Sequence, residues 1–412
     1  MPGDYKNSGV EWIGDIPVCC DVIKFKQAIS ATNSGEVIDK NYWNDGDELL
    51  YTCQKTPMKS TYYNFPAHKR TEPGDLLLTR NATPYIFIPE PNSIYSNVVQ
   101  RVKIHEGYFL HYLRYAVLLG AEALVVNGNT IPSYNMEVWR NISIPMYPYQ
   151  QQQRIADYLD AKCLEIENVL EQTRNTIEEY KHLKQAIIYS AVTKGVLGDR
   201  ELQESGVEWL GTIPKGWKVR RVANLYDERS ESGLEELPIL TVSINSGVSD
   251  HEIADEDKDR VFVRSEDRTK YKRVYPGDLA YNMMRAWQGA FGAVRVDGMV
   301  SPAYVVAKPK PGVQLDSRYM EALLRTPAAI EEMHRYSRGI VDFRLRLYWP
   351  EFKNIRICLP PLEEQTEIAD YIDQKSAELD ALIAKKEQFL AELENYKKSL
   401  IYEYVTGKKE VQ

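Results

Sequence analysis

One stretch of about twenty residues occurs twice in the chain, and this repeat limits the possible folds more than any other feature. Residues 141–160 align with residues 354–373 without a gap, and ten of the twenty positions are identical. In each copy a Pro-containing segment leads into a long helical pattern, so the repeat marks the start of a helix. The sequence therefore predicts an internal duplication, with two long helices that begin 213 residues apart.

Two further repeats lie before the helices. Residues 8–12 (Ser-Gly-Val-Glu-Trp) return as residues 205–209, which is a separation of 197 residues. The sequence Pro-Gly-Asp-Leu occurs at residues 73–76 and at 276–279, a separation of 203. The separation therefore grows towards the 213 of the helices, which indicates that the segments between the repeats were remodelled after the duplication.

The fold class predicted from these patterns is α+β, because a chain of 412 residues is too long for one core. Short β-branched and aromatic runs alternate with turn residues before each helix, which favours small α/β domains with mostly antiparallel sheets. The predicted segments are a first domain at 1–149, a long helix at 150–195, a second domain at 196–362 and a second helix at 363–412. Strands are expected at 76–79, 97–102, 240–244 and 303–306, and short helices at 108–119 and 317–324.

Both long helices carry apolar residues at alternating spacings of three and four, which is typical of a coiled coil. We expect the two helices to pair with each other in antiparallel orientation, because each must end where the other domain begins. That arrangement would also bring the two chain termini together. Two separate amphipathic helices, each packed on its own domain, are the alternative. The predicted seam comprises Ile155, Leu159, Cys163, Ile166, Leu170, Thr173, Ile177, Tyr180, Lys184 and Ile187 in one helix, and Ile368, Ile372, Ser376, Leu379, Ile383, Lys386, Leu390, Leu393, Lys397 and Leu400 in the other.

The formal net charge of −8 resides entirely in the two helices, since residues 150–190 and 363–403 carry the whole excess of acidic side chains. Neutral domains with local basic clusters are compatible with a site-specific DNA reader but not with a sequence-blind DNA coat. The five cysteines show no CxxC spacing, and no apolar run is long enough for a membrane span. We therefore expect a cytoplasmic protein with reduced thiols and no contact with a membrane.

The order of these motifs resembles the specificity subunit of type I restriction-modification enzymes. The resemblance rests on Gly-Val-Glu-Trp-Ile-Gly at 9–14, on Pro-Leu-Glu-Glu-Gln-Thr-Glu-Ile-Ala at 361–369, and on the duplication itself. It is close in the second domain, through residues 240–248, 277–285 and 300–306, and looser in the first, through 74–76 and 128–132. The resemblance implies two target-recognition domains, each reading one half of a bipartite site in double-stranded DNA. It also implies that the coiled coil sets the spacer and docks two adenine-methyltransferase subunits, with restriction subunits joining through the complex.

No catalytic motif accompanies this resemblance. The sequence contains neither an adenine-methylation motif nor a GxxxxGK[ST] phosphate loop, and its six histidines show no metal-binding spacing. We expect a non-catalytic chain without a cofactor of its own, whose partners bind S-adenosylmethionine, ATP and Mg²⁺. Two other classes remain open: a coiled-coil scaffold whose globular ends bind proteins, and an unrecognised nuclease.

Candidate DNA contacts are polar, basic and aromatic side chains in predicted loops, because such groups reach base edges and phosphates. In the first domain they are Lys55, Tyr62, Tyr63, Lys69, Arg70, Arg80, Asn81, Thr83, Asn129, Ser133 and Tyr134. In the second they are Ser243, Asn245, Tyr281, Asn282, Arg285, Trp287, Gln288, Arg335, Arg338, Arg344 and Arg346. For any one of them an ordinary surface or strand position is an equal alternative, and the arginine cluster at 335–346 could instead pair with Glu331, Glu332 or Asp342.

Two further expectations follow from comparing the repeats. Residues 79–83 differ from their counterparts at 281–285, so the two half-sites should differ and the whole target should be non-palindromic. The helix starts agree best, which suggests that they bind the partner subunits, although helix-entry geometry would explain the same identity. The expected partner contacts are Gln152, Tyr158, Gln365 and Tyr371.

Overall fold

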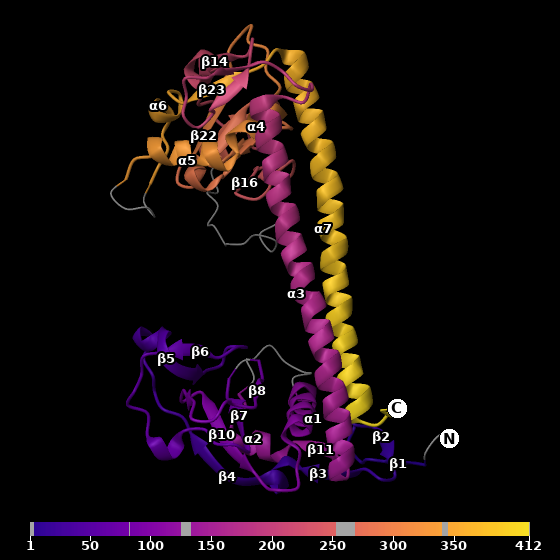
Figure 1. Ribbon diagram of the computed structural model, residues 1–412. Coiled ribbons are helices and arrows are strands. Elements are labelled where there is room, and N and C mark those ends of the chain that lie inside the picture. The colour runs from indigo at the N-terminus through magenta and orange to yellow at the C-terminus, as the bar shows by residue number, and fades with distance from the viewer. Residues whose placement is uncertain (1–3, 82, 125–132, 253–267, 340–344, 412) are drawn as a thin grey trace. The chain divides into compact units, whose positions relative to one another are not determined.

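The computed structural model describes residues 4–81, 83–124, 133–252, 268–339 and 345–411 (Figure 1). The chain divides into two compact units, and the division falls within both long helices. Unit 1 contains Met1–Arg174 with Gln388–Gln412, and unit 2 contains Asn175–Glu387.

Unit 1 is built around a four-stranded antiparallel sheet in the order β4-β10-β7-β8. Helix α1 packs over this sheet and shares its core, and α2 is capped by the side chain of Asn135, which accepts a hydrogen bond from the N–H of Val138 at 3.0 Å. A second sheet, β6-β5-β9, contains the parallel pair β5/β9. The elements are β1 (Tyr5–Asn7), β2 (Asp15–Pro17), β3 (Asp21–Lys24), β4 (Ile29–Ser34), β5 (Trp43–Tyr51), β6 (Met58–Ser60), β7 (Asp75–Thr79), β8 (Ile86–Phe87), β9 (Ile94–Tyr95), β10 (Val99–Ile104), α1 (Leu110–Ala123), α2 (Met136–Asn141) and β11 (Ser143–Met146).

Unit 2 repeats this topology, since its four-stranded sheet has the equivalent order β15-β22-β19-β20. The two-stranded ribbons β1-β2 and β3-β11 of unit 1 also return, as β12-β13 and β14-β23. The duplication predicted from sequence is therefore confirmed at the level of strand order. The elements are β12 (Leu202–Glu204), β13 (Thr212–Pro214), β14 (Lys218–Arg221), β15 (Tyr226–Arg229), β16 (Val242–Ser243), β17 (Gly247–Val248), β18 (Lys272–Val274), β19 (Leu279–Asn282), β20 (Phe291–Ala293), β21 (Gly298–Val300), β22 (Tyr304–Pro309), α4 (Ser317–Leu324), α5 (Pro327–Tyr336), α6 (Trp349–Phe352) and β23 (Arg356–Leu359).

The two long helices are α3 (Tyr149–Lys194) and α7 (Leu362–Val405), and neither contains Gly or Pro. Each is followed by a glycine with a positive φ, Gly195 at 77° and Gly407 at 73°, which is a common way for a helix to end. The helices pair in antiparallel orientation, as predicted. In unit 1 Arg174 lies 2.9 Å from Glu394, and in unit 2 Lys184 lies 2.7 Å from Asp380.

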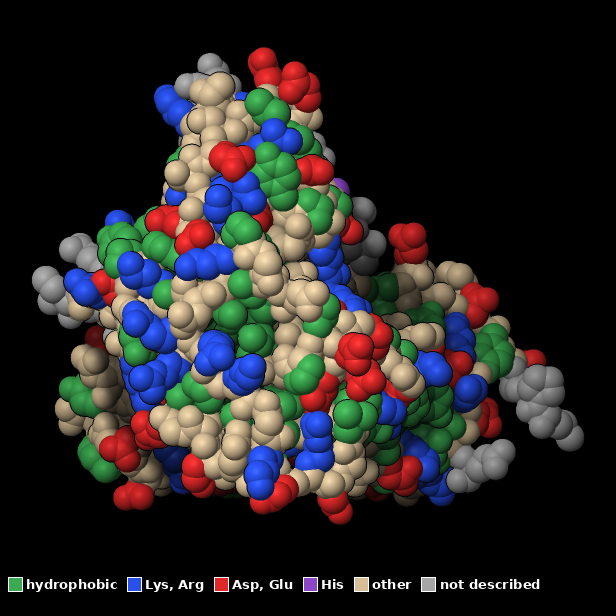
Figure 2. All heavy atoms as spheres, turned by 90° about the horizontal axis from the view of Figure 1, so that it is seen from above, with side chains coloured by type: hydrophobic (Ala, Val, Ile, Leu, Met, Phe, Trp, Pro, Cys, Tyr) green, Lys and Arg blue, Asp and Glu red, His purple; other side chains and the backbone are tan. Residues whose placement is uncertain are grey.

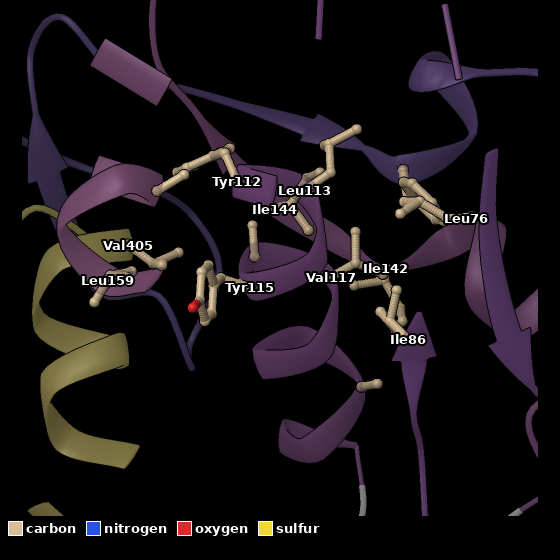
Figure 3. Close-up of a cluster of buried hydrophobic side chains, with 14 of the residues drawn as sticks. Leu76, Ile86, Tyr112, Leu113, Tyr115, Val117, Ile142, Ile144, Leu159 and Val405 are labelled. Atoms are coloured by element: carbon tan, nitrogen blue, oxygen red, sulfur yellow. The ribbon is translucent and has the colours of Figure 1, made fainter. Parts of the chain in front are cut away.

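Every predicted seam position of both helices is buried or half-buried, so the periodicity identified the correct faces. The ends of the long helices also belong to the domain cores. In this respect the alternative prediction, in which each helix packs on its own domain, is partly right. Figure 3 shows Leu159 of α3 and Val405 of α7 beside Tyr115 of α1. In unit 2, Val192 of α3 and Ile368 of α7 share the core in the same way.

The chain termini meet within unit 1, as the predicted arrangement requires (Figure 1). The hydroxyl of Tyr5 donates a hydrogen bond to the carbonyl of Gly407 at 2.8 Å. The predicted short helix at 317–324 coincides with α4, whereas the predicted strand at 240–244 is extended only over Val242–Ser243. Among the described residues, no helix combines the length and apolar character needed to cross a bilayer.

Candidate nucleic-acid interface

The repeated Pro-Gly-Asp-Leu sequence places a buried aspartate before the central strand of each sheet. Asp75 Oδ2 accepts hydrogen bonds from the N–H of Glu72 and from Arg101 Nε, both at 2.6 Å. Asp278 Oδ2 accepts from the N–H of Tyr275 at 3.0 Å and lies 2.9 Å from Arg229 Nε. These aspartates close the turns into β7 and β19, and each of those strands then leads to a candidate recognition loop.

The loop that follows β19 is held by its own hydrogen bonds. Asn282 Oδ1 accepts from the N–H of Met284 at 3.0 Å, and the indole N–H of Trp287 donates to the carbonyl of Met284 at 3.0 Å. The carbonyl of Met283 accepts from the N–H of Leu347 at 2.8 Å, which ties the loop to a distant segment. The loop therefore presents Met284, Arg285 and the exposed Gln288 from a fixed backbone.

Helix α5 borders this loop. Thr326 caps α5, accepting a hydrogen bond from the N–H of Ala329 at 3.3 Å, and Pro327 occupies the first helical position. Near the end of α5, the ring of His334 lies 5.6 Å from the ring of Trp287. Just beyond it, Arg338 and Arg346 form a two-residue bridge with both N–H···O distances at 2.9 Å. Unit 2 thus brings the predicted residues of 282–288, 335–338 and 346 together.

The turn between β16 and β17 forms another border of the loop. Ser243 Oγ accepts a hydrogen bond from the N–H of Asn245 at 3.1 Å, and Arg325 donates to the carbonyl of Asn245 at 2.6 Å. A Cβ added at Gly289 would lie 4.0 Å from the carbonyl oxygen of Ile244, so this turn adjoins the end of the 282–288 loop. Asn245 is exposed and Ser243 is half-buried, so only the first presents its side chain fully.

Neighbouring carboxylates divide the arginines of unit 2 into two groups. Arg335 lies 3.1 Å from Glu208, 3.5 Å from Glu332 and 3.6 Å from Glu331, and Arg338 lies 2.6 Å from Glu351. The predicted alternative of pairing with Glu331 and Glu332 is therefore confirmed for Arg335. In contrast, Arg285 and Arg346 have no carboxylate partner among the described residues, so their guanidinium groups are available to a ligand.

Arg285 lies beside a partly buried tyrosine. Burial raises the pKa of Tyr304, and the positive charge of Arg285 acts in the opposite direction. Tyr304 is also the strand partner of Asn282, which places Arg285 next to the end of the central sheet. The backbone of Arg285 is thus held close to a rigid element, which favours precise positioning of a base-reading group.

Two basic candidates of unit 1 are neutralised within the fold. Arg70 donates two hydrogen bonds to the carboxylate of Glu48, at 2.7 and 2.8 Å, and Lys69 forms an ion pair with Glu36. The hydrogen bonds from Arg70 hold the pKa of Glu48 below its usual value. Arg70 and Lys69 are therefore already paired with carboxylates of unit 1, which makes them poor candidates for phosphate contacts.

Three of the remaining candidates of unit 1 form a group. Arg80, Asn81 and Ser133 come together, because Asn81 and Ser133 form an antiparallel bridge and the carbonyl of Arg80 accepts from the N–H of Tyr134 at 2.6 Å. The other candidates are separate: the ring of Tyr62 lies edge-on to that of Tyr42, and Lys55 lies 3.8 Å from Glu167. Tyr63 and Thr83 are exposed. Asn129 and Arg344 lie outside the described residues.

Comparison with known proteins identifies the relatives of this chain. Residues 291–394, which include part of unit 2 and most of α7, match the type I restriction modification DNA specificity domain. The chain is similar to type I specificity subunits. It is 24% identical over 348 residues to the MjaVIII specificity subunit of Methanocaldococcus jannaschii, covering 78% of this chain and 76% of that protein. It is also 24% identical over 379 residues to the EcoBI specificity subunit of Escherichia coli, covering 84% and 77%.

A solved structure supports the same fold. A chain from a study of complex assembly and conformational transition of the type I R-M system superimposes with a TM-score of 0.66 at 16% identity. The alignment covers 96% of this chain and 99% of that one, so the likeness includes both units and both long helices. The predicted mixed fold of tandem domains and long helices is thereby confirmed.

Two predicted DNA contacts of this chain are wrong. Tyr134 is 1% exposed and its hydroxyl donates to the carbonyl of Ala121 at 3.3 Å. Tyr281 is fully buried in the core, with its ring 4.8 Å from that of Phe352. Neither side chain can reach a nucleic acid in this structure. Tyr281 lies in β19, a strand buried on both faces, whereas Tyr134 packs against Trp139 just before α2. The sequence around them gave no signal that distinguished a buried from an exposed tyrosine.

Two predicted partner contacts are also wrong, because Gln152 and Gln365 are buried. Gln152 Nε2 donates to the carbonyl of Tyr147 at 2.7 Å, and Gln365 Nε2 donates to that of Pro360 at 2.9 Å. Helix-entry geometry therefore explains the identity of these glutamines between the repeats. Tyr158 is half-buried and the centre of its ring lies 4.5 Å from that of Tyr404, whereas Tyr371 remains exposed. The role of these two tyrosines in partner binding stays a prediction.

Sequence reasoning missed one exposed side chain in the recognition loop of unit 2. Met284 is 44% exposed and stands between Asn282 and Arg285. An apolar contact of this kind can read the methyl group of thymine in the major groove. The signal was its position within the polar loop, but a methionine in a β-rich segment more often belongs to a core. Among the described residues, no group of three or more His, Cys, Asp or Glu side chains is placed to hold a metal ion.

Proposed function

We propose that the chain is the sequence-specific DNA-recognition subunit of a type I restriction-modification complex. Each unit reads one half of a bipartite target in double-stranded DNA. The observation that carries this proposal is the combination of equivalent strands with different loops. Strands β7 and β19 occupy the same place in two sheets of equivalent order, yet the loops that follow them begin with different side chains. Equivalent scaffolds with different loops are what two unequal half-sites require.

The chemistry of the loop after β19 fits base recognition. Arg285 carries an uncompensated guanidinium group, which can donate two parallel hydrogen bonds to the O6 and N7 atoms of a guanine. Gln288 and Asn245 are exposed amides that suit an adenine edge. Because the loop backbone is fixed by Asn282 and Trp287, little conformational entropy is lost when these groups bind.

The long helices supply the second part of the proposed function. We infer that the antiparallel pair α3/α7 holds the two half-site readers at a fixed spacing and docks two methyltransferase subunits. Restriction subunits would join through that complex. The repeat supports a count of two, because a duplicated chain offers two similar surfaces to one partner. Exposed Tyr371, near the start of α7, is one candidate contact on such a surface.

Catalysis is assigned to the partners. We propose that the chain itself neither methylates nor cleaves DNA, and that S-adenosylmethionine, ATP and Mg²⁺ bind to the partner subunits. This proposal is supported by the similarity of the chain to the two specificity subunits named above. The proposed division of labour leaves the present chain with one task, the choice of the DNA sequence.

The test is reconstitution of the chain with methyltransferase subunits from the same organism. The complex should retain one duplex sequence in preference to scrambled competitors, and should methylate it only when this chain is present. A protein-binding scaffold would give partner binding without sequence preference. A nuclease would give metal-dependent cleavage by the purified chain alone. Either of those results, in place of sequence-selective retention, would overturn the proposal.

A further inference from the structure

A second basic surface lies on unit 2, apart from the recognition loop. The ribbon β14/β23 and the residue after α6 carry five basic side chains, here called the basic ribbon: Lys218, Arg220, Arg221, Lys353 and Arg356. All are exposed except Lys353, which is half-buried. None of the five has a carboxylate partner among the described residues. Figure 2 looks onto the end of unit 2 where β14 and β23 lie, and Lys and Arg side chains gather on that face.

The basic ribbon contains an unfavourable pair that needs an explanation. Arg221 and Arg356 are direct partners in the antiparallel register of β14 and β23. Like charges directly opposite each other destabilise a pair of strands. The side chain of Arg221 donates to the amide oxygen of Asn354, which does not neutralise its charge. An anion bound by both guanidinium groups would remove the repulsion between them.

The equivalent ribbon of unit 1 carries fewer bases, because only Arg221 and Lys353 have basic counterparts there, Lys24 and Arg140. There β3 pairs with β11, and Lys24 stands opposite Ser143. Lys24 Nζ donates to Ser143 Oγ at 2.8 Å and to the carbonyl of Asn141 at 2.9 Å, and it faces no second base across the ribbon. At the positions of Arg220 and Lys218, unit 1 has Ile23 and Asp21. The larger part of the uncompensated charge, from Lys218, Arg220 and Arg356, is thus particular to unit 2.

We infer that the basic ribbon binds the sugar–phosphate backbone of DNA beyond the half-site read by unit 2. This inference rests on the proposed function and adds to it a contact that is independent of sequence. Guanidinium groups match phosphate oxygens in shape and remain charged at all physiological pH values. The rest of the chain is neutral or acidic, so a basic surface of this density does not arise from composition. Because unit 1 carries fewer bases at the equivalent ribbon, the contact is expected to be stronger on the side of the target that unit 2 reads.

The basic ribbon and the recognition loop occupy different parts of unit 2. In Figure 1, β14 and β23 lie at one end of the unit, whereas β16 lies towards its other end. The side chains of Arg220, Arg221 and Arg356 therefore cannot share the base edges assigned to Arg285. Their expected contribution is affinity and its salt dependence, with no effect on which sequence is chosen.

The experiment uses the complex of the full chain with its methyltransferase subunits. Arg220, Arg221 and Arg356 are changed together to Gln, Gln and Ser, where Ser is the residue that unit 1 carries opposite Lys24. A matched control changes Lys103, Lys215 and Lys310 to Gln, because these lysines lie outside the long helices and already pair with Glu72, Glu201 and Asp227. A third variant, with Lys at the three ribbon positions, retains the charge. Affinity is measured against salt for two duplexes, one ending at the second half-site and one continuing beyond it.

On the longer duplex, the ribbon variant should lower the slope of log K against log salt by about 0.9 for each phosphate that is no longer neutralised. The control and the Lys variant should keep the wild-type slope, and the methylated sequence should be unchanged in all of them. An unchanged slope in the ribbon variant overturns the inference. So does loss of a partner subunit at an unchanged slope, which would assign the surface to an acidic protein. If the wild-type complex shows no preference for any sequence, the proposed function fails, while the slope on unspecific DNA still tests the ribbon.

Discussion

The side chain of Gln152 accepts a hydrogen bond from the N–H of Phe109 at 2.9 Å, which joins the start of α3 to the first turn of α1. Gln365 accepts from the N–H of Asp316 at 3.0 Å and joins α7 to α4 in the same way. In each repeat one amide therefore satisfies an N–H that the helix itself leaves unpaired. This clamp fixes the angle at which a long helix leaves its domain.

Replacing Gln152 by Ala should destabilise unit 1 by about 1–3 kcal/mol, because the N–H of Phe109 and the carbonyl of Tyr147 are left without their partner. Urea unfolding followed by tryptophan fluorescence measures the change. Gln150→Ala, at an exposed position two residues earlier, is the matched control and should have little effect. If Gln152→Ala keeps full stability but no longer binds the methyltransferase subunit, the clamp is the wrong explanation of the repeat.

Replacing Arg285 by Ala should weaken or relax recognition of the second half-site by about 1–3 kcal/mol, the usual worth of a bidentate hydrogen-bonded pair with a base. Arg335→Ala is the matched control, because Arg335 is already paired with Glu208, Glu331 and Glu332. Competition binding with single-base variants of each half-site measures both. A uniform loss of affinity across all sequences would identify Arg285 as a phosphate ligand, and equal effects of the two variants would contradict the assignment.

The pair Glu48–Arg70 predicts a pH dependence of unit 1. Hydrogen bonds from Arg70 lower the pKa of Glu48 below its ordinary 4.5, so the folded state binds this proton less readily than the unfolded state. The stabilisation is then present above pH 4.5 and is lost as the pH falls through the lowered pKa. Glu48→Gln should flatten the stability profile below pH 4.5, whereas exposed Glu106→Gln should not. Identical profiles for wild type and Glu48→Gln would refute the coupling.

The antiparallel helices predict a ruler. Adding one heptad to both α3 and α7, in register, lengthens each by about 10 Å, which corresponds to roughly three base pairs. The unspecified spacer of the target should grow by that amount, because the seam is preserved and the domains are unchanged. Circular dichroism checks that helix content rises as expected, and methylation mapping reads the spacer. A well-folded variant that still methylates a target with the original spacer would contradict the hypothesis that helix length sets the spacer.

Sequence periodicity and repeats predicted much of the architecture, because both depend on local spacing. The seam faces, α4 and the equivalence of the two units all follow from such spacing. The partner of each buried aspartate could not be predicted in this way. Asp75 pairs with Arg101 of β10, but Asp278 pairs with Arg229 of β15, which occupies the place of β4. The duplicated carboxylate has thus recruited its arginine from a non-equivalent strand.

Side-chain availability was the harder part of the site. Composition cannot distinguish Arg285, which has no carboxylate partner among the described residues, from Arg335, which has three. One of the three carboxylates that pair with Arg335 is that of Glu208, which lies 127 residues earlier in the sequence. Likewise, the burial of Tyr281 depends on Phe291 and Phe352, which reach it from other elements. Tertiary contacts of this kind determine which loop residues remain free to bind.

The central claim is that two equivalent units read two different half-sites. Methylation mapping of genomic DNA, from cells that express this chain with its methyltransferase subunits, tests it most directly. We predict one methylated target made of two unlike half-sites at a fixed spacing, and no methylation of that target when this chain is absent. A palindromic target, or an identical methylation pattern without the chain, would contradict the account.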